Sequence, residues 1–253
     1  MEEPVVDIIM ATYNGAKYVS EQIESIQRQS YKNWRLLISD DCSSDATLDI
    51  VRSYTKSDDR IKLISNEVKF GGAMPNFLNA LSKSESSLFM FCDQDDIWLE
   101  DKIKISVEYI TSLENEFGTD KPIFVSSDMK IVDDDLNLLS SSFINYERFG
   151  TKDSSLGHAL IENNVWGCTI IGNASLRIWL NRCASYDGLI MHDWLVNLIC
   201  KSAGFSYFIN ESTSLYRQHT GQEVGSHKFS FFKLVSGFSL QNSRSFWNTV
   251  RKN

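Results

Sequence analysis

Cysteine pairs at disulfide or metal-binding spacing are missing from this 253-residue chain. The five cysteines are odd in number, widely separated and never arranged as Cys-x-x-Cys: Cys42, Cys92, Cys168, Cys183 and Cys200. This pattern indicates neither a disulfide framework nor a zinc site. We therefore expect reduced, largely buried thiols of the kind found in cytosolic proteins.

Long apolar segments are missing as well, and we expect no leader sequence. No apolar run approaches the roughly 20 residues that are needed to span a bilayer. The first residues, Met-Glu-Glu-Pro, lack the basic and apolar regions of a signal peptide. Internal repeats and low-complexity linkers are also absent. We expect a cytoplasmic protein.

A basic surface for nucleic acid is missing, because the formal net charge of the chain is −8. Positive charge collects only at the end, where residues 228–253 contain five basic residues, several aromatic residues and no acidic ones. Two interpretations of this basic aromatic tail, residues 226–253, stay open. It is either an amphipathic segment that binds anionic lipid on the inner face of the membrane, or a segment that packs on the domain or on the second subunit of a homodimer.

Neither Gly-rich phosphate signature occurs, since the chain has no Gly-x-x-x-x-Gly-Lys-Ser/Thr and no Gly-x-Gly-x-x-Gly. The first loop also lacks the Gly-rich, basic character that we would expect of a nucleotidyltransferase. If this chain binds a nucleotide, it holds it through acidic residues and a metal ion.

Strands and helices alternate four times in the first part of the chain. Apolar, β-branched runs predict the strands, and apolar residues at helical spacing predict the helices. The predicted strands are 5–10, 34–39, 60–65 and 88–92, and the helices follow each of them at 16–29, around 50–54, at 72–81 and from 99. This alternation predicts an α/β fold, a doubly wound, mostly parallel central sheet flanked by helices.

After Lys121 the alternation loosens. We expect a polar, substrate-facing region at 140–165 and a solvated turn at 133–135. The remaining predicted elements are a strand at 123–127, helices at 173–183 and 192–203, and two separate strands at 205–209 and 214–217.

Three carboxylates follow the buried strand at 88–92. Asp93 and Asp95 have Gln94 between them, so in an extended chain both side chains point to one side. Asp96 follows directly. Clustered carboxylates repel one another unless a cation is present, and hard oxygen ligands suit Mg²⁺ or Mn²⁺. The alternative is a solvated acidic turn before the next helix.

Two further loops, 11–15 and 40–45, leave the same edge of the predicted sheet, where open α/β folds bind their ligands. Thr12, Tyr13 and Asp40 offer a hydroxyl, an aromatic face and an acceptor that suit a nucleobase. Asp93 suits a ribose hydroxyl, and Asp95 suits a metal on a diphosphate. The alternative for both loops is turn and helix-capping chemistry.

Three motifs in this order, Ala11-Thr-Tyr-Asn-Gly, Ser39-Asp-Asp-Cys-Ser-Ser-Asp and Cys92-Asp-Gln-Asp-Asp, resemble glycosyltransferase family 2, whose members are inverting enzymes with the GT-A fold. The later Met191-His-Asp-Trp and Tyr216-Arg-Gln-His-Thr-Gly resemble its rhamnosyltransferase-like branch. The resemblance covers residues 5–225. It implies one GT-A domain over 1–225, with a nucleotide-binding half (1–98) and an acceptor-binding half (99–225).

The resemblance also implies a role for individual positions. Asp193 matches the general base; its alternative is a helix N-cap. The nucleotide-binding positions are Thr12, Tyr13, Asn14, Asp40, Asp93 and Gln94. The metal ligands are Asp95 and His219; Arg217, Gln218 and Asp96 lie near the diphosphate or the donor sugar; Asn163, Trp166, Gly167 and Trp194 line the acceptor pocket. For Trp166 and Trp194, core packing is a nearly equal alternative to sugar stacking.

Together these features predict a Mn²⁺- or Mg²⁺-dependent transferase of surface polysaccharide biosynthesis. The resemblance suggests TDP-rhamnose as the donor first, and UDP-galactose or UDP-N-acetylhexosamine next. The acceptor would be a glycan or a lipid-linked saccharide. The alternative is a catalytically silent member of the same fold that binds a nucleotide or a glycan. A nucleotidyltransferase is a weaker third hypothesis.

Overall fold

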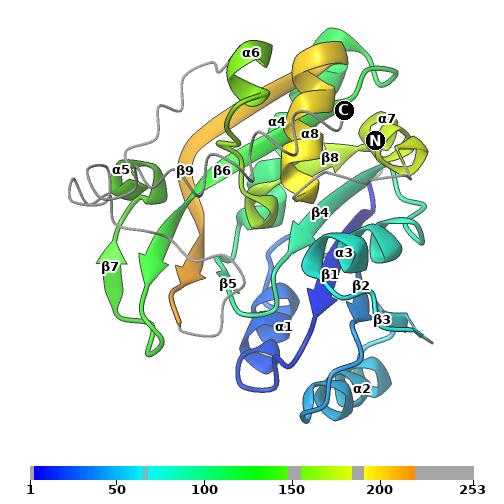
Figure 1. The fold of residues 1–253 in the computed structure, drawn as a ribbon, viewed down its shortest axis with the longest axis vertical. Helices are drawn as coiled ribbons and strands as arrows, with labels where there is room; N and C mark the ends of the chain where they lie inside the picture. The colour runs from blue at the N-terminus through cyan, green and yellow to red at the C-terminus, as the bar shows by residue number, and fades with distance from the viewer. Residues whose placement is uncertain (1–2, 65, 67, 148–154, 184–190, 220–253) are drawn as a thin grey trace, which may run out of the picture.

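The computed structural model describes residues 3–64, 66, 68–147, 155–183 and 191–219 (Figure 1). The tail predicted at 226–253 lies outside these residues. In the described part of the chain, all five cysteines are free and Cys92, Cys168 and Cys200 are buried, as predicted. Within the same ranges, no helix has the length and apolar character to cross a membrane.

One mixed sheet organises the described residues. Its strand order is β3-β2-β1-β4-β8-β6-β9-β5, with β7 paired to β6. The strands are β1 (Val6–Thr12), β2 (Trp34–Asp40), β3 (Ile61–Ile64), β4 (Leu88–Cys92), β5 (Ile97–Trp98), β6 (Ile123–Val132), β7 (Leu138–Ser140), β8 (Ile171–Asn173) and β9 (Phe205–Arg217). Strands β1 to β4 are parallel, and so are β6 and β9, whereas β8 runs antiparallel to both β4 and β6.

Helices cover both faces of this sheet. One face packs against α1 (Val19–Gln27), α2 (Thr47–Ser57) and α4 (Lys102–Phe117). The other packs against α3 (Ala73–Leu81), α7 (Ala174–Arg182) and α8 (His192–Ala203) (Figure 1). Two short helices, α5 (Phe143–Glu147) and α6 (Leu156–Ala159), and the 3₁₀ turn η1 (Gly167–Thr169) lie between β7 and β8 in the chain. The predicted fold class is therefore confirmed.

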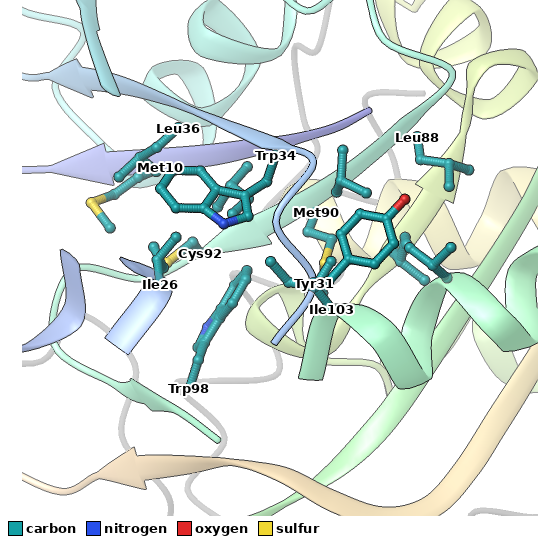
Figure 2. Packing of buried hydrophobic residues seen from close by; sticks show 14 of the residues in the cluster. Met10, Ile26, Tyr31, Trp34, Leu36, Leu88, Met90, Cys92, Trp98 and Ile103 are labelled. Carbon is teal, nitrogen blue, oxygen red and sulfur yellow. The ribbon is translucent and has the colours of Figure 1, made fainter. Parts of the chain in front are cut away.

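The core on the first face is built from alternate residues of the parallel strands. Val6, Ile8 and Met10 point to this side of β1 and are fully buried, because successive side chains of a strand point to opposite faces. Figure 2 shows Met10 and Cys92 beside the indole rings of Trp34 and Trp98, with Ile26 reaching in from α1. Burial of these apolar side chains stabilises the strands whose ends carry the polar loops.

The later part of the chain departs from the prediction in two places. The strands expected at 205–209 and 214–217 are one continuous strand, β9, because register shifts beside Ser127 and Asp128 of β6 absorb the polar stretch between them. Strand β8 was not predicted. It has only three residues, and Gly172 is required there because an added Cβ would lie 2.5 Å from Cζ of Phe89.

Candidate active site

The carboxyl ends of β1, β2 and β4 meet at one edge of the sheet. Thr12 is paired with Asp40, and Met10 with Cys92, so the loops that follow the three strands leave side by side, as expected from the sequence. Beside them lies a cavity of about 470 Å³. Its lining includes Thr12, Tyr13, Asp41, Lys69, Asn76, Phe77, Asp93, Gln94, Asp95, Met191 and Tyr216.

Hydrogen bonds fix the loop after β1. The amide of Gln94 accepts from the backbone N–H of Tyr13 at 3.0 Å and donates to its carbonyl at 3.1 Å. Asn14 has a positive φ of 48°, and its side-chain oxygen accepts from the N–H of Ser44 at 2.8 Å. Gly15 lies against Gln94, because an added Cβ would approach its Oε1 to 2.1 Å. Asn14 and Gln94 thus hold the loops together.

The ring of Tyr13 borders the cavity and is 44% exposed. Nζ of Lys69 lies 4.1 Å from the ring centroid and donates to the hydroxyl at 2.8 Å. A partly exposed aromatic ring with a fixed backbone is a suitable platform for stacking a base. Sequence reasoning missed Lys69, since a lysine in a loop carries no signal of its own.

The two aspartates after β2 have different surroundings. Asp40 is buried, and its carboxylate accepts hydrogen bonds from Thr12 Oγ1 at 2.8 Å and from the N–H and hydroxyl of Ser43 at 2.8 and 2.6 Å. Asp41 lines the cavity and accepts from the backbone N–H groups of Phe70 and Gly71. The structure therefore places Asp41, which the sequence did not distinguish, on the cavity wall, and turns Asp40 towards Thr12 and Ser43.

Asp95 and His219 come together, as the ligand assignment requires. Oδ2 of Asp95 lies 2.8 Å from Nε2 of His219. The imidazole packs against the ring of Tyr18, with centroids 4.4 Å apart, and the Tyr18 hydroxyl donates to Asp134 at 2.8 Å. Tyr18 and Asp134 are thus supporting residues that the sequence did not reveal.

Asp96 is fully buried beneath this pair. One carboxylate oxygen accepts from the N–H of Arg217 at 3.3 Å, and the other has no hydrogen-bond partner among the described residues. Burial, together with the charges of Asp95 and Asp93, raises the pKa of Asp96 well above its usual value.

This acidic corner fits a divalent cation. Donor atoms of Asp93, Asp96 and Cys168 lie within 4.8 Å of one another. Asp95 lies between Asp93 and Asp96 in the sequence and is paired with His219. Three carboxylates follow one strand end, and one of them has a buried oxygen that no N–H or O–H of the described residues satisfies. They form an oxygen-rich donor set of the kind that Mn²⁺ or Mg²⁺ prefers.

Arg217 is buried and contacts three separate segments. Nε donates to the carbonyl of Asp95 at 3.0 Å, Nη1 to the carbonyl of Asp134 at 2.8 Å, and Nη2 pairs with Glu21. The N–H of Gln218 donates to Val132. Arg217, Gln218 and Asp96 do not appear among the described residues that line the cavity. The guanidinium joins α1, the β6–β7 turn and the acidic loop.

Asp193 lies in the first turn of α8 and is 7% exposed. Its Oδ1 accepts from Asn163 Nδ2 at 3.0 Å and from the N–H of Trp194 at 2.6 Å, and its Oδ2 accepts from the N–H of Gly167 at 3.2 Å. Burial raises the pKa of this carboxyl from 3.8 to about 6, although these donors act in the opposite direction. Met191, the N-cap of this helix, lines the cavity, whereas Asp193 does not appear among the described residues that line it.

The predicted acceptor residues gather around Asp193. Asn163, Gly167 and Trp194 contact its carboxylate, as just described, and the indole N–H of Trp194 donates to the carbonyl of Ala159 at 2.5 Å. The ring of Trp166 packs edge-on against Phe143, with centroids 4.6 Å apart. Both indoles therefore make packing or hydrogen-bond contacts within the protein.

His192, next to Asp193, was given no role from sequence. Its ring is buried against Phe77 and Phe91, with centroids 4.3 and 4.4 Å away. Burial lowers its pKa to about 3, so the imidazole is neutral. A Cβ on Gly167 would lie 2.5 Å from Nε2 of His192, so there is no space for a side chain at this position, whose N–H donates to Asp193.

A cavity at the carboxyl ends of parallel strands, with clustered carboxylates in its wall, lies where open α/β folds bind their ligands. The profile of the family described as "Glycosyl transferase family 2" matches residues 7–153. The chain belongs to this family and is a glycosyltransferase.

Relatives and solved structures agree with this assignment. The chain is 29% identical to "dTDP-rhamnosyl transferase RfbG" of Shigella flexneri over 235 residues, 86% of this chain and 74% of the relative. It is 34% identical to "Putative teichuronic acid biosynthesis glycosyltransferase TuaG" of Bacillus subtilis (strain 168) over 108 residues, 43% of this chain and 42% of the relative.

The fold is similar to that of solved glycosyltransferases. S. aureus TarS 1-349 in complex with UDP has a TM-score of 0.61 at 20% identity, over 84% of this chain and 60% of that one. The mannosyltransferase PcManGT from Pyrobaculum calidifontis, in complex with GDP-Man and Mn²⁺, has a TM-score of 0.62 at 16% identity, over 87% and 59%. These likenesses confirm the predicted GT-A fold.

Proposed function

We propose that this chain is an inverting, metal-dependent rhamnosyltransferase that uses dTDP-rhamnose in surface polysaccharide biosynthesis. The observation that carries this proposal is one cavity whose wall includes Asp95, which is paired with His219, and Met191, the N-cap of the helix that carries the buried Asp193. The similarity to RfbG, which extends over 86% of the chain, supports the choice of donor. A glycan or lipid-linked saccharide is the proposed acceptor.

The proposed reaction is a single displacement. The acceptor hydroxyl attacks the anomeric carbon, the bond from that carbon to the diphosphate oxygen breaks, and the hydroxyl proton passes to the carboxylate of Asp193. A carboxyl with a pKa of about 6 is a stronger proton acceptor than an ordinary aspartate and is still mostly ionised at neutral pH. The donors Asn163 and Gly167 hold this carboxylate in one orientation.

The acidic corner is the proposed position of the diphosphate. Asp95 and His219 would hold a Mn²⁺ or Mg²⁺ ion, with Asp93 and Asp96 adjacent, and the bound ion would supply positive charge to the leaving diphosphate. Tyr13 would stack on the base, and Asp41 stands on the same wall of the cavity. The first 98 residues would thus bind the nucleotide, and residues 99–225 would supply His219, Asp193 and the acceptor contacts.

Thermal unfolding with dTDP, UDP, GDP and CDP, each with and without Mn²⁺, tests the nucleotide and metal assignments. A ligand at 100 times its dissociation constant adds about 2.7 kcal/mol of stability, which such an experiment detects easily. We expect dTDP to stabilise the protein most, and only when Mn²⁺ is present. Equal stabilisation with and without the ion would contradict metal dependence, and a preference for GDP or CDP would contradict the donor.

A further inference from the structure

One buried polar group in the cavity wall has no role in the proposed reaction. Asn76, on the inner side of α3, is 2% exposed and lines the cavity. Its Nδ2 donates to the carbonyl of Thr12 at 3.3 Å. Its Oδ1 has no hydrogen-bond partner among the described residues. A buried amide oxygen without a partner is costly, so a ligand that satisfies it would bind more tightly.

The contact with Thr12 fixes the orientation of this amide. Because Nδ2 is directed at a backbone carbonyl, the two ends of the amide cannot exchange without placing two oxygens against each other. The free end is therefore an acceptor. It repels phosphate oxygens, and its partner must be an N–H or O–H group of the ligand.

A nucleotide sugar carries such donors on its base and on its sugar, and the surroundings of Asn76 favour the sugar. The next residue, Phe77, also lines the cavity and contacts His192, the neighbour of Asp193. The lining residues just before Asn76 in the chain are Gly71, Gly72 and Ala73, which carry at most a methyl group and so leave room for a sugar ring. Tyr13 and Lys69, the stacking platform for a base, lie on the side of Thr12, to which Asn76 donates with Nδ2, so a contact with the base is the alternative that the test below separates from a contact with the sugar.

We propose that Oδ1 of Asn76 accepts a hydrogen bond from a hydroxyl of the donor sugar and so contributes to the choice of sugar. This inference rests on the proposed function, because it requires a nucleotide sugar in the cavity. Asn76 would act in binding alone, since its amide neither gains nor loses a proton.

The test compares dTDP with dTDP-rhamnose, which differ by the sugar. Both are titrated calorimetrically, with Mn²⁺, into the wild-type chain and into Asn76→Leu, a variant of similar size without the acceptor. We expect the variant to bind dTDP with an affinity within about twofold of the wild type and dTDP-rhamnose about tenfold more weakly, as the loss of one neutral hydrogen bond predicts. Binding of dTDP also demonstrates that the variant is folded.

The matched control is Asn79→Leu, the same substitution on the same helix. Asn79 donates to Ser39 Oγ at 3.0 Å and to Asn66 Oδ1 at 2.9 Å, and does not line the cavity. Asn79→Leu should leave the ratio of the affinity for dTDP to that for dTDP-rhamnose unchanged. Equal weakening of dTDP and dTDP-rhamnose by Asn76→Leu would assign the contact to the nucleotide and overturn the proposal, as would no weakening at all. A wild-type chain that binds dTDP but not dTDP-rhamnose would instead refute the proposed donor.

Discussion

The replacement Asp193→Asn should change how stability depends on pH as well as abolish sugar transfer. The carboxyl of Asp193 is 7% exposed, and burial raises its pKa from 3.8 to about 6. Asparagine has nearly the same shape and cannot ionise. Wild type and variant therefore differ by one titrating group whose pKa changes on folding.

The size of the effect follows from the pKa shift. In the unfolded chain this carboxyl titrates near 3.8 and in the native protein near 6, so between these values the native state binds the extra proton. Stability then falls as pH rises through this window, and no further loss occurs above the native pKa. A shift of roughly 2 units at 1.36 kcal/mol each corresponds to about 3 kcal/mol, most of which is lost between pH 4 and 7.

Urea unfolding of both proteins from pH 4 to pH 8 measures this difference. The free energy of unfolding of the wild type minus that of the variant should fall by about 2 to 3 kcal/mol over that range, since every other titrating group is common to the two. In Asp193→Asn the new NH₂ group faces the Gly167 N–H, a repulsion that lowers stability equally at all pH values. If the free energies of unfolding of the wild type and the variant changed with pH in parallel, the reasoning would be refuted, because the carboxyl of Asp193 would then not be desolvated on folding.

Transfer by the wild type should rise about tenfold between pH 5 and pH 7, as the carboxylate of the proposed base becomes ionised; a flat profile over this range would contradict the assignment. His219→Ala should weaken the apparent affinity for Mn²⁺ in nucleotide binding by at least about tenfold, because Asp95 loses its partner. His158→Ala, on an exposed helix, serves as the control in the same Mn²⁺ titration. Gly15→Ala should lower the free energy of unfolding by about 1 to 3 kcal/mol, because the new Cβ displaces Gln94 from its two hydrogen bonds. Adding Gly15→Ala to Gln94→Ala should cost much less, and an unchanged cost in this double-mutant cycle would show that the contact does not matter.

The first half of the fold could be predicted from the sequence because each strand there is a short apolar run. Strand β4 has the predicted bounds, β2 differs from prediction by one residue at one end, and β1 and β3 differ by one or two residues at both ends. Their parallel order also brought the three loops to one edge, as expected. The later half was harder to predict, since β8 has three residues, too few for any periodicity, and β9 continues through Asn210 to Ser212 only because β6 accommodates it.

The candidate site, too, has residues that could be predicted from the sequence and residues that could not. Asp95, His219 and Asp193 carry motif signals, and the structure surrounds each with partners suited to its proposed role. Neighbouring aspartates, in contrast, look alike in a sequence. Asp41 rather than Asp40 lines the cavity, because successive side chains at the end of a strand point to opposite sides and the sequence does not show which side faces the cavity.

The three residues of β8 have a consequence for the newly made chain. They fill the gap between β4 and β6, and hydrogen-bond to both. A ribosome adds roughly 5 to 20 residues per second, so Ile171 follows Cys92 by roughly 4 to 16 seconds. During that interval β4 has an open edge carrying Phe89 and Phe91, and β6, which is synthesised earlier than β8, is available as a wrong neighbour. The strand that joins the two parts of the sheet is therefore made after both of its neighbours, and until then each of them has an unpaired edge with which another chain could pair.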